Sequence, residues 1–543
     1  MVIGLAKLKK IKMNKEKKEG IIELSRNGNG YVRFGSAESE ERVFVHKKNL
    51  NQSLDGDKVL FSILQQSGDY KEAKVESIVE RSRIDFSGVL EVNKEKGHAF
   101  VRTSGGSMPV DFYVPLEKLN GGNNGDVVIV RLIRWNKKEK SPTGVVTKVL
   151  GKANTHETEM GSIMFKHGID YSFPEEVEKE ANEIPIEIPE SEILKRKDMR
   201  ETLTFTIDSI SARDLDDALS FKVLDNGNYE IGVHIADIGH YVKRGGEIDK
   251  EALNRGTSVY LVDRCIPMLP EKLSNNLASL NPNTDKLTVS TIFEISPEGE
   301  VLNYKFKKTV INSNYRFTYD EVQDIIESGN GAMWKNYVDE PPFPDLINAI
   351  VILDKVAKKI RAKRFENGSV YFNSKEPIFI LDENNVPVDV KFNKLKDSNQ
   401  LIEEYMLLTN RYVGSFLYKN KILAAFRVHD SPNTEKILEL SLLVKQFGYN
   451  LKTEGSVEEV KKSLNKLLID VKETPEESMI STLAVRCMSK AKVSPINIGH
   501  YGLGKDFMPP NAYTWFTSGI RRYADIINQR QLFDFLDSKK NRT

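Results

Sequence analysis

Four aspartates within ten residues are the part of this sequence best suited to chemistry. They are Asp208, Asp214, Asp216 and Asp217, and the only basic residue among them is Arg213. Carboxylates this close repel one another unless a positive charge lies between them. Mg²⁺ prefers oxygen ligands and is commonly held by a few carboxylates together with substrate phosphates. The cluster therefore indicates a two-metal site, with a solvated acidic loop as an equal alternative on composition alone.

Two other acidic motifs fit this spacing poorly. A calcium EF-hand loop needs glycine at its sixth position and glutamate at its twelfth, and no frame starting at Asp208 or Asp214 supplies both. The Asp-Leu-Asp-Asp tetrad also looks like the acid motif of class II terpene cyclases, which are all-helical. Here strand-like patterns at 202–207 and 218–224 flank the aspartates. We therefore expect the aspartates to lie in a tight loop that joins two strands.

Length and composition exclude several classes of protein. A chain of 543 residues with 39% hydrophobic and 29% charged residues is not globally disordered and has room for three or four domains. No apolar run approaches the roughly 18 to 20 residues that span a bilayer. Two distant cysteines, Cys265 and Cys487, suggest neither a disulfide framework nor a zinc site. These features predict a cytoplasmic protein.

The elements before the aspartates contain an internal repeat. Residues 20–59 read as strand, glycine turn, strand, strand, loop and strand, and the same order recurs at 88–128. Both units resemble cold-shock domains of the OB type, which bind single strands by stacking bases on aromatic side chains. Each ring could equally belong to a barrel core. The predicted RNA-binding side chains are Tyr31, Phe34, Phe44 and His46 in the first unit, and Phe100, Phe112 and Tyr113 in the second.

The predicted fold is an α+β multidomain chain in which two five-stranded OB barrels precede a large mixed α/β domain. The first segment, 1–18, is lysine-rich and reads as a basic arm. The other predicted boundaries are 19–83 for the first barrel, 84–152 for the second, 153–200 for an acidic connector and 201–543 for the catalytic domain.

Six separated motifs, in order along the chain, resemble the RNB catalytic domain of the ribonuclease II/ribonuclease R family. The resemblance covers about residues 19–536. It implies a processive 3′→5′ exoribonuclease that hydrolyses single-stranded RNA with a free 3′ end to nucleoside 5′-monophosphates, in RNA decay and quality control. It also implies two Mg²⁺ ions, with Mn²⁺ as a substitute, and a monomer that does not engage membranes. The motifs span 206–218, 234–237, 256–260, 267–275, 427–430 and 516–523.

The resemblance also assigns roles to individual residues. The four aspartates become metal ligands, and Asp216 is expected to be the most sensitive to substitution. Arg521 and Arg522 would bring guanidinium donors to the scissile phosphate. His234, His429 and His500 are left out of the catalytic set because Mg²⁺ does not call for imidazole. The expected RNA contacts are Tyr260 and Phe372 stacking on the terminal base, and Glu404 near a ribose 2′-hydroxyl.

Several departures from the family pattern predict weaker activity. The family usually has proline at Gly519, proline or glycine at Ala524 and histidine at Gln529, and a glycine loosens the backbone that aims the arginines. Residues 505–510 are extra and are expected to reshape the channel wall. The family continues into a further OB-type barrel, whereas this sequence ends at Thr543, which predicts lower affinity and weaker salt dependence. The alternative function is an RNA-binding protein or RNA chaperone with weakened catalysis, acting through its OB domains.

Overall fold

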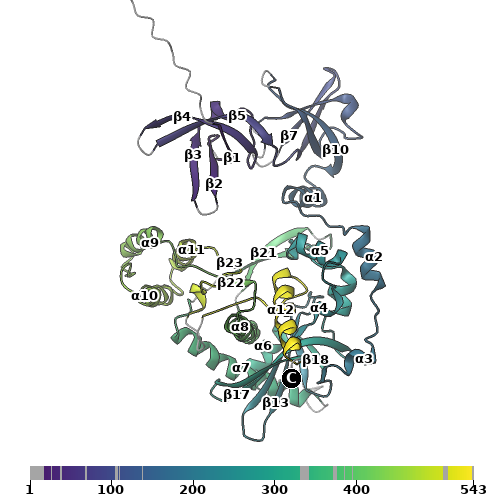
Figure 1. The fold of residues 1–543 in the computed structure, drawn as a ribbon, viewed down its shortest axis with the longest axis vertical. Helices are drawn as coiled ribbons and strands as arrows, with labels where there is room; N and C mark the ends of the chain where they lie inside the picture. The colour runs from purple at the N-terminus through teal and green to yellow at the C-terminus, as the bar shows by residue number, and fades with distance from the viewer. Residues whose placement is uncertain are drawn as a thin grey trace, which may run out of the picture. The chain divides into compact units, whose positions relative to one another are not determined.

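The computed structural model describes residues 17–540, except 26, 37–38, 68–69, 104–107, 109, 137–138, 330–341, 371–375, 385, 394 and 505–510 (Figure 1). The chain divides into two compact units, Met1–Tyr171 and Ser172–Thr543. Among the described residues, no helix is long and apolar enough to cross a membrane.

The first unit contains two closed five-stranded barrels, so the predicted pair of OB barrels is confirmed. The strand order is β1-β2-β3-β5-β4 in the first barrel and β10-β8-β7-β6-β9 in the second. β1 begins at Lys17, inside the predicted basic arm. The strands are β1 (Lys17–Leu24), β2 (Gly30–Ser36), β3 (Ser39–Val45), β4 (Lys58–Ser67), β5 (Tyr70–Glu80), β6 (Asp85–Asn93), β7 (His98–Thr103), β8 (Phe112–Pro115), β9 (Asp126–Arg134) and β10 (Thr143–Lys152).

The two barrels are closed by equivalent residues. Gly20 on β1 and Gly88 on β6 each pass so near a neighbouring strand that an added Cβ would lie 2.5 Å from one of its atoms. Only glycine allows an approach of that kind. Asp57 and Asp126 each accept, at 2.8 Å, the backbone N–H of the residue three positions earlier in the turn before a strand. The sequence repeat is therefore a structural repeat.

The predicted connector is divided between the two units. Helix α1 (His156–Lys166) packs on the second barrel, where Ser162 Oγ donates to Ser87 Oγ at 3.2 Å. Helices α2 (Glu175–Glu183) and α3 (Glu190–Ile193) belong to the second unit, and α2 buries Val177 and Ala181 in a core of that unit.

A seven-stranded mixed sheet organises the second unit, in the order β11-β18-β17-β14-β13-β12-β19. Helices α6, α7 and α8 contribute to a core on one side of the sheet, and α2 and α5 contribute to a second core. Because both faces are covered, β12 buries four consecutive residues instead of alternating. The strands are β11 (Lys197–Asp198), β12 (Thr204–Asp208), β13 (Asp217–Val223), β14 (Tyr229–Ala236), β17 (Asp285–Ile295), β18 (Val301–Asn312) and β19 (Tyr315–Thr318).

Helices α9, α10 and α11 form a third core beside this sheet domain (Figure 1). Short hairpins pair β15 with β16, β20 with β21 and β22 with β23. The remaining helices are α4 (Ile238–Tyr241), α5 (Glu247–Arg255), α6 (Tyr319–Ser328), α7 (Phe343–Glu366), α8 (Asp397–Lys419), α9 (Thr434–Gln446), α10 (Val457–Asp470), α11 (Glu477–Cys487) and α12 (Tyr523–Lys540). The hairpin strands are β15 (Val259–Tyr260), β16 (Cys265–Ile266), β20 (Glu376–Leu381), β21 (Pro387–Asn393), β22 (Phe426–Val428) and β23 (Lys492–Ser494), and short helical turns occupy Lys47–Asn49, Leu116–Lys118, Lys272–Leu277 and Tyr501–Leu503.

Candidate active site

The aspartate loop, residues 208–217, joins two neighbouring antiparallel strands, as the sequence predicts. Asp208 is the last residue of β12, and Asp217 is the first residue of β13. Between them Leu215 is fully buried, and its backbone N–H donates to Ser279 Oγ at 3.1 Å. The leucine anchors the loop at its centre.

A single arginine holds the backbone of the first half of the aspartate loop by hydrogen bonds. Arg316 on β19 donates from Nη2 to the carbonyl oxygens of Ser209, Ile210 and Ala212, at 3.1, 3.3 and 2.7 Å. Three backbone carbonyl groups of the aspartate loop therefore converge on one guanidinium. β19 lies parallel to β12 in the sheet, which places this arginine beside the loop.

Burial and mutual repulsion make the carboxylates of the aspartate loop difficult to ionise. Burial raises the pKa of Asp208 to about 6, and the negative charge of Asp214 adds to this rise, while Arg316 opposes it. Burial likewise raises the pKa of Asp216 to about 7. The pKa of Asp217 is raised well above its usual value by burial and by the charges of Asp208 and Asp216. The loop is short of positive charge.

Tyr260 lies beside the aspartates. Its hydroxyl donates to Asp214 Oδ2 at 2.9 Å, and its side chain is 55% exposed. The ring stands on the β15–β16 hairpin. An exposed aromatic face is therefore available within a hydrogen bond of the carboxylate cluster.

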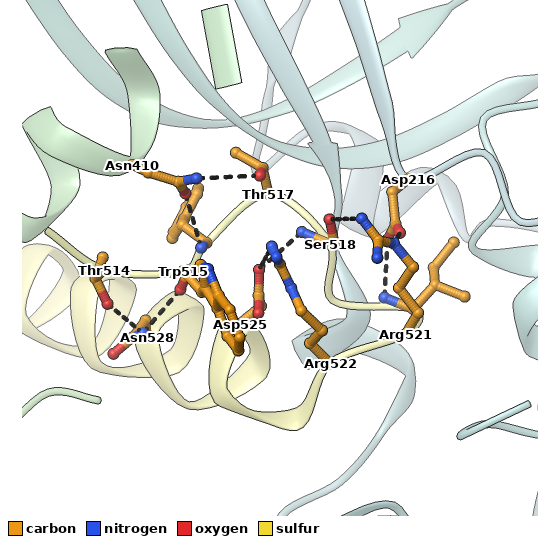
Figure 2. Close-up of polar contacts among 12 residues, drawn as sticks. Asp216, Asn410, Thr514, Trp515, Thr517, Ser518, Arg521, Arg522, Asp525 and Asn528 are labelled. Carbon is orange, nitrogen blue, oxygen red and sulfur yellow. Dashed lines mark hydrogen bonds and ion pairs between the residues drawn. The ribbon is translucent and has the colours of Figure 1, made fainter. Parts of the chain in front are cut away.

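A second segment, residues 511–522 before α12, brings positive charge to the aspartates (Figure 2). The backbone N–H of Ile520 donates to Asp216 Oδ1 at 2.9 Å. Arg521 Nε lies 3.4 Å from Asp216 Oδ2, and Arg521 Nη2 donates to Ser518 Oγ at 3.0 Å. We call residues 511–522 the arginine segment; it meets the aspartate loop at Asp216.

Arg522 is held differently from Arg521. Its Nη2 donates to Asp525 Oδ1 at 2.7 Å, and its guanidinium carbon lies 4.5 Å from the centre of the Trp515 ring. Asp525 is fully buried on α12 and also accepts the Ser518 N–H at 2.9 Å. Arg521 is therefore the arginine in direct contact with the aspartates, and Arg522 is positioned by Asp525 and Trp515.

Two buried asparagines fix the backbone of the arginine segment (Figure 2). Asn410 on α8 accepts the Phe516 N–H at 2.9 Å. Asn528 on α12 donates to the carbonyl of Trp515 at 2.8 Å and to Thr514 Oγ1 at 2.6 Å. The segment is therefore rigidly placed by helices on both sides.

Gly519 and Gln529, two of the departures from the family pattern, are neighbours in space. A Cβ at Gly519 would lie 3.0 Å from Ile238 Cγ1 and 3.2 Å from Gln529 Nε2. The glutamine Nε2 donates to the Phe516 carbonyl at 3.1 Å. The residues on either side of Gly519 donate their N–H groups to buried carboxylates. Those two bonds offset the conformational freedom of the glycine.

The chemistry of the aspartate loop suits a hard cation. Asp208 Oδ2 and Asp216 Oδ2 are buried and have no hydrogen-bond partner among the described residues. Within the same part of the chain, no three acidic, histidine or cysteine side chains converge into a preformed metal cage. Mg²⁺ is usually bound by one or two carboxylates with water and substrate phosphates, so the residues present fit such an ion when RNA supplies the remaining ligands.

Glu404, one of the predicted RNA contacts in this unit, is buried in an ion pair. Glu404 is 2% exposed, and both of its carboxylate oxygens accept hydrogen bonds from Arg364. This buried pair favours a structural role for Glu404 over a contact with a ribose hydroxyl. Phe372 lies outside the described residues.

His234 is a core residue, as the sequence indicates. Its Nδ1 lies 2.7 Å from Ser290 Oγ and its Nε2 lies 2.9 Å from Ser220 Oγ. Both ring nitrogens are therefore used, and burial lowers the pKa of the imidazole to about 3.

The aromatics of the first barrel differ in exposure. Tyr31 is 43% exposed, and its ring centre lies 5.5 Å from that of Phe44. Phe34 packs edge-on against the core residue Phe61, at 5.1 Å between ring centres. His46 accepts the Lys48 N–H through Nδ1 and so begins a helical turn. Tyr31 and Phe44 are the better placed for stacking.

In the second barrel, the prediction that Phe112 binds RNA is wrong. Phe112 is fully buried, and its ring centre lies 5.2 Å from that of Phe86 in the barrel core. Successive residues of a strand point to opposite faces, so the next residue, Tyr113, is the exposed one. The Tyr113 ring lies 6.0 Å from Phe100 and 6.4 Å from His98.

Three residues that position the site were not predicted from the sequence. Asp525 follows Arg522 by three residues at the start of a helix, a spacing that could have revealed the pair. Trp515 stands one residue before the Phe516 motif. Arg316 carries no sequence signal, because about one hundred residues separate it from the loop that it folds.

Comparison with known proteins agrees with this architecture. The RNB domain model matches residues 196–538, and a cold shock domain model matches residues 100–174, which defines an RNB-domain nuclease with cold-shock barrels. The chain is 36% identical to ribonuclease R of Thermotoga maritima, over 97% of this chain and 72% of that protein. It is 34% identical to ribonuclease R 1 of Lactococcus lactis, over 96% of this chain and 63% of that protein.

A solved structure matches nearly the whole chain. Mycoplasma genitalium RNase R in complex with ribose-methylated single-stranded RNA matches with a TM-score of 0.87 at 27% identity, covering 96% of this chain and 80% of that one. The chain belongs to the ribonuclease R family of exoribonucleases. The resemblance inferred from the six motifs is confirmed.

Proposed function

We propose that this chain is a processive 3′→5′ exoribonuclease that degrades single-stranded RNA from a free 3′ end to nucleoside 5′-monophosphates. We also propose that it uses two Mg²⁺ ions and acts as a cytoplasmic monomer in RNA decay and quality control. The observation that carries the proposal is the meeting of the aspartate loop and the arginine segment at Asp216, through Ile520 N–H and Arg521 Nε. That contact brings crowded carboxylates and a guanidinium to one point.

The four aspartates would hold the metal ions. When bound, such ions would supply an activated water and stabilisation of the leaving 3′-oxygen of the terminal phosphodiester. Asp208 offers a buried oxygen without a hydrogen bond, Asp216 offers one that faces Arg521 Nε at 3.4 Å, and the raised pKa values of Asp208, Asp216 and Asp217 reflect the same need for positive charge. A nucleophilic side chain is not required.

Arg521 is suited to the scissile phosphate. Its guanidinium borders Asp216 and is partly exposed, so it can donate to phosphate oxygens as negative charge develops. Tyr260 would stack on the terminal base, because its ring is exposed while its hydroxyl is fixed on Asp214. Stacking of this kind tolerates any base.

The barrels would bind RNA upstream of the 3′ end. Tyr31 with Phe44, and Tyr113 with Phe100, form two aromatic clusters of the kind on which single-stranded bases stack.

A second candidate is an RNA-binding protein or RNA chaperone with weakened catalysis. Gly519 and Gln529 favour it, since they depart from the family pattern directly beside the arginines.

One assay separates the two candidates. Single-stranded RNA labelled at its 5′ end and free at its 3′ end is incubated with the protein and Mg²⁺ or Mn²⁺, alongside Asp216→Asn and a 3′-blocked RNA. The exonuclease yields a short limit product from the free-ended RNA, and the variant does not. RNA that is bound yet stays full length at every metal concentration would show that the binding protein is the correct description.

A further inference from the structure

Two arginines share one tryptophan beside the catalytic arginine. The guanidinium carbon of Arg427, on β22, lies 4.2 Å from the centre of the Trp515 ring, and that of Arg522 lies 4.5 Å from it. We call these three residues the Arg–Trp–Arg cluster. Arg522 directly follows Arg521, so the cluster adjoins the site where the aspartates meet the arginine segment.

The positive charge of the cluster is only partly balanced. Arg522 is paired with Asp525 at 2.7 Å. Arg427 forms no ion pair with any carboxylate of the described residues, although it is partly buried. Burial lowers the pKa of Arg427, and the charge of Arg522 lowers it further, whereas Tyr513 opposes this. The ring offers each cation modest stabilisation at such distances.

Hydrogen bonds fix the backbone on which the cluster stands. The Arg427 N–H donates to the Tyr513 carbonyl at 2.9 Å, and Asn528 holds the Trp515 carbonyl at 2.8 Å. The Thr514 hydroxyl donates to the Ala425 carbonyl at 2.7 Å, which ties the arginine segment to the residues before β22. The Trp515 ring stands on this fixed backbone and orients the Arg427 guanidinium, whose planar group suits bidentate donation to phosphate.

We propose that the Arg–Trp–Arg cluster binds a backbone phosphate of the RNA other than the scissile one, with Arg427 as the donor and Trp515 as the positioning residue. The proposal rests on the exoribonuclease function above and adds a specific subsite to it. Arg521 acts at the scissile phosphate, and Arg427 fixes the register of the strand relative to it.

The test measures RNA binding by the full chain in EDTA, over a series of KCl concentrations, so that it does not depend on cleavage. Arg427→Gln should weaken binding about tenfold, as expected for a lost charged hydrogen bond. It should also reduce the magnitude of the slope of log affinity against log salt by about 0.7, the value for one phosphate of a single strand. Trp515→Leu should resemble Arg427→Gln, and Trp515→Phe should keep most of the affinity.

Matched variants separate this role from loss of charge or of folding. Arg486→Gln, on an exposed position of α11, removes the same charge and should leave the slope unchanged. Arg427→Lys should keep the slope but lose part of the affinity, which supplies a folded variant if the glutamine variant does not fold. With Mg²⁺, Arg427→Gln should raise KM about tenfold and change kcat by less than about threefold.

Two results would overturn the proposal. In one, Arg427→Gln and Arg486→Gln bind RNA with the same affinity and salt slope. In the other, Arg427→Gln lowers kcat while binding is unchanged, which would place the arginine in the chemical step. If the wild-type protein binds RNA but does not cleave it, the exonuclease function fails while the subsite is still decided by the EDTA measurement.

Discussion

The aspartate loop and the arginine segment meet at one carboxylate, yet they differ in charge and in how their polar groups are held. The loop crowds four acidic side chains, leaves Asp208 Oδ2 buried without a hydrogen bond among the described residues, and raises the pKa values of Asp208 and Asp216. The arginine segment has its backbone fixed by side chains of α8 and α12, including Asn410, Asn528 and Asp525.

This difference separates two requirements of a catalytic site. The part of a site that binds a cation benefits from crowded carboxylates whose negative charge is not balanced by the protein, because the bound cation then supplies the missing positive charge. The part of a site that stabilises developing negative charge benefits from hydrogen-bond donors that are already oriented, because these donors need not reorganise during the reaction. Substitutions should therefore have different consequences in the two halves.

The largest effect is expected at the point of contact. Asp216→Asn keeps an oxygen that can accept the Ile520 N–H but removes the charge beside Arg521. We expect the rate of RNA hydrolysis to fall at least about 1,000-fold while the protein remains folded, since metal binding and the arginine contact are both lost. Single-turnover cleavage and circular dichroism measure the two parts. Activity within tenfold of wild type would mean that this contact does not organise the site.

The next effect tests whether Arg316 shapes the aspartate loop. Arg316→Gln removes the donor that gathers three carbonyls, and we expect a loss of activity of roughly 10- to 100-fold from misplaced carboxylates. Arg316→Lys should recover only part of it, because an ammonium lacks the planar fork. Raising the Mg²⁺ concentration should partly restore both variants. If Arg316→Gln matches the surface variant Arg486→Gln in cleavage rate, the loop holds its shape without Arg316.

A third, smaller effect concerns stability. The native pKa values of Asp208 and Asp216, about 6 and about 7, lie above the usual value of 3.8. Between about pH 4 and 7 these two carboxyl groups hold protons in the native state that they release in the unfolded state, so their contribution to stability falls as pH rises. The buried imidazoles of His234 and His500, with pKa values lowered by burial to about 3, act in the opposite direction over the same range. The loss caused by the aspartate loop is therefore measured as a difference in melting temperature between the wild type and a loop variant, which should be larger at pH 8 than at pH 5.

Asp217→Asn should counter that loss. Removing one charge from the crowded loop is expected to raise the melting temperature at pH 8 by about 2 °C, while cleavage is lost. Mg²⁺ should stabilise the wild type more than the variant. A variant that melts below the wild type at pH 8 would contradict the idea that the carboxylates destabilise the metal-free fold. Calorimetry or fluorescence-detected thermal unfolding measures the melting temperatures of the wild type and the variant.

The smallest effect lies in the arginine segment. Gly519→Ala places a methyl group 3.0 Å from Ile238 and 3.2 Å from Gln529, and overpacking of this kind costs about 1 to 3 kcal/mol. Combining it with Gln529→Ser should recover part of the loss, because the shorter side chain leaves room. A double-mutant cycle by denaturant unfolding measures the coupling. Additive effects would show that the two positions are independent.

The sequence predicted features that depend on local pattern. The barrels followed from strand alternation and repeated glycine turns, and the aspartate loop followed from strand patterns on both sides of the acidic run. Phe112 was misassigned because an aromatic-rich strand does not show which of its faces is the core, and Tyr113 next to it proved to be exposed.

Long-range contacts could not be predicted from local pattern. Arg316 reaches its loop through sheet order, with β19 added beside β12, and nothing near residue 316 signals that pairing. Glu404 was predicted to lie near a ribose 2′-hydroxyl, but Arg364 on α7 pairs with its buried carboxylate. Gly519 and Gln529 each looked like a separate departure, and only the fold shows that they touch.

The hydrogen bond between Ile520 and Asp216 also has a consequence for synthesis of the protein. The two residues are 304 positions apart, so the aspartate loop emerges from the ribosome long before the segment that completes it. Domains fold in order during translation, and the barrels and much of the sheet can form first. The nascent chain would thus acquire its RNA-binding barrels before residue 520 can complete the site around Asp216, so the proposed cutting activity would appear later than RNA binding.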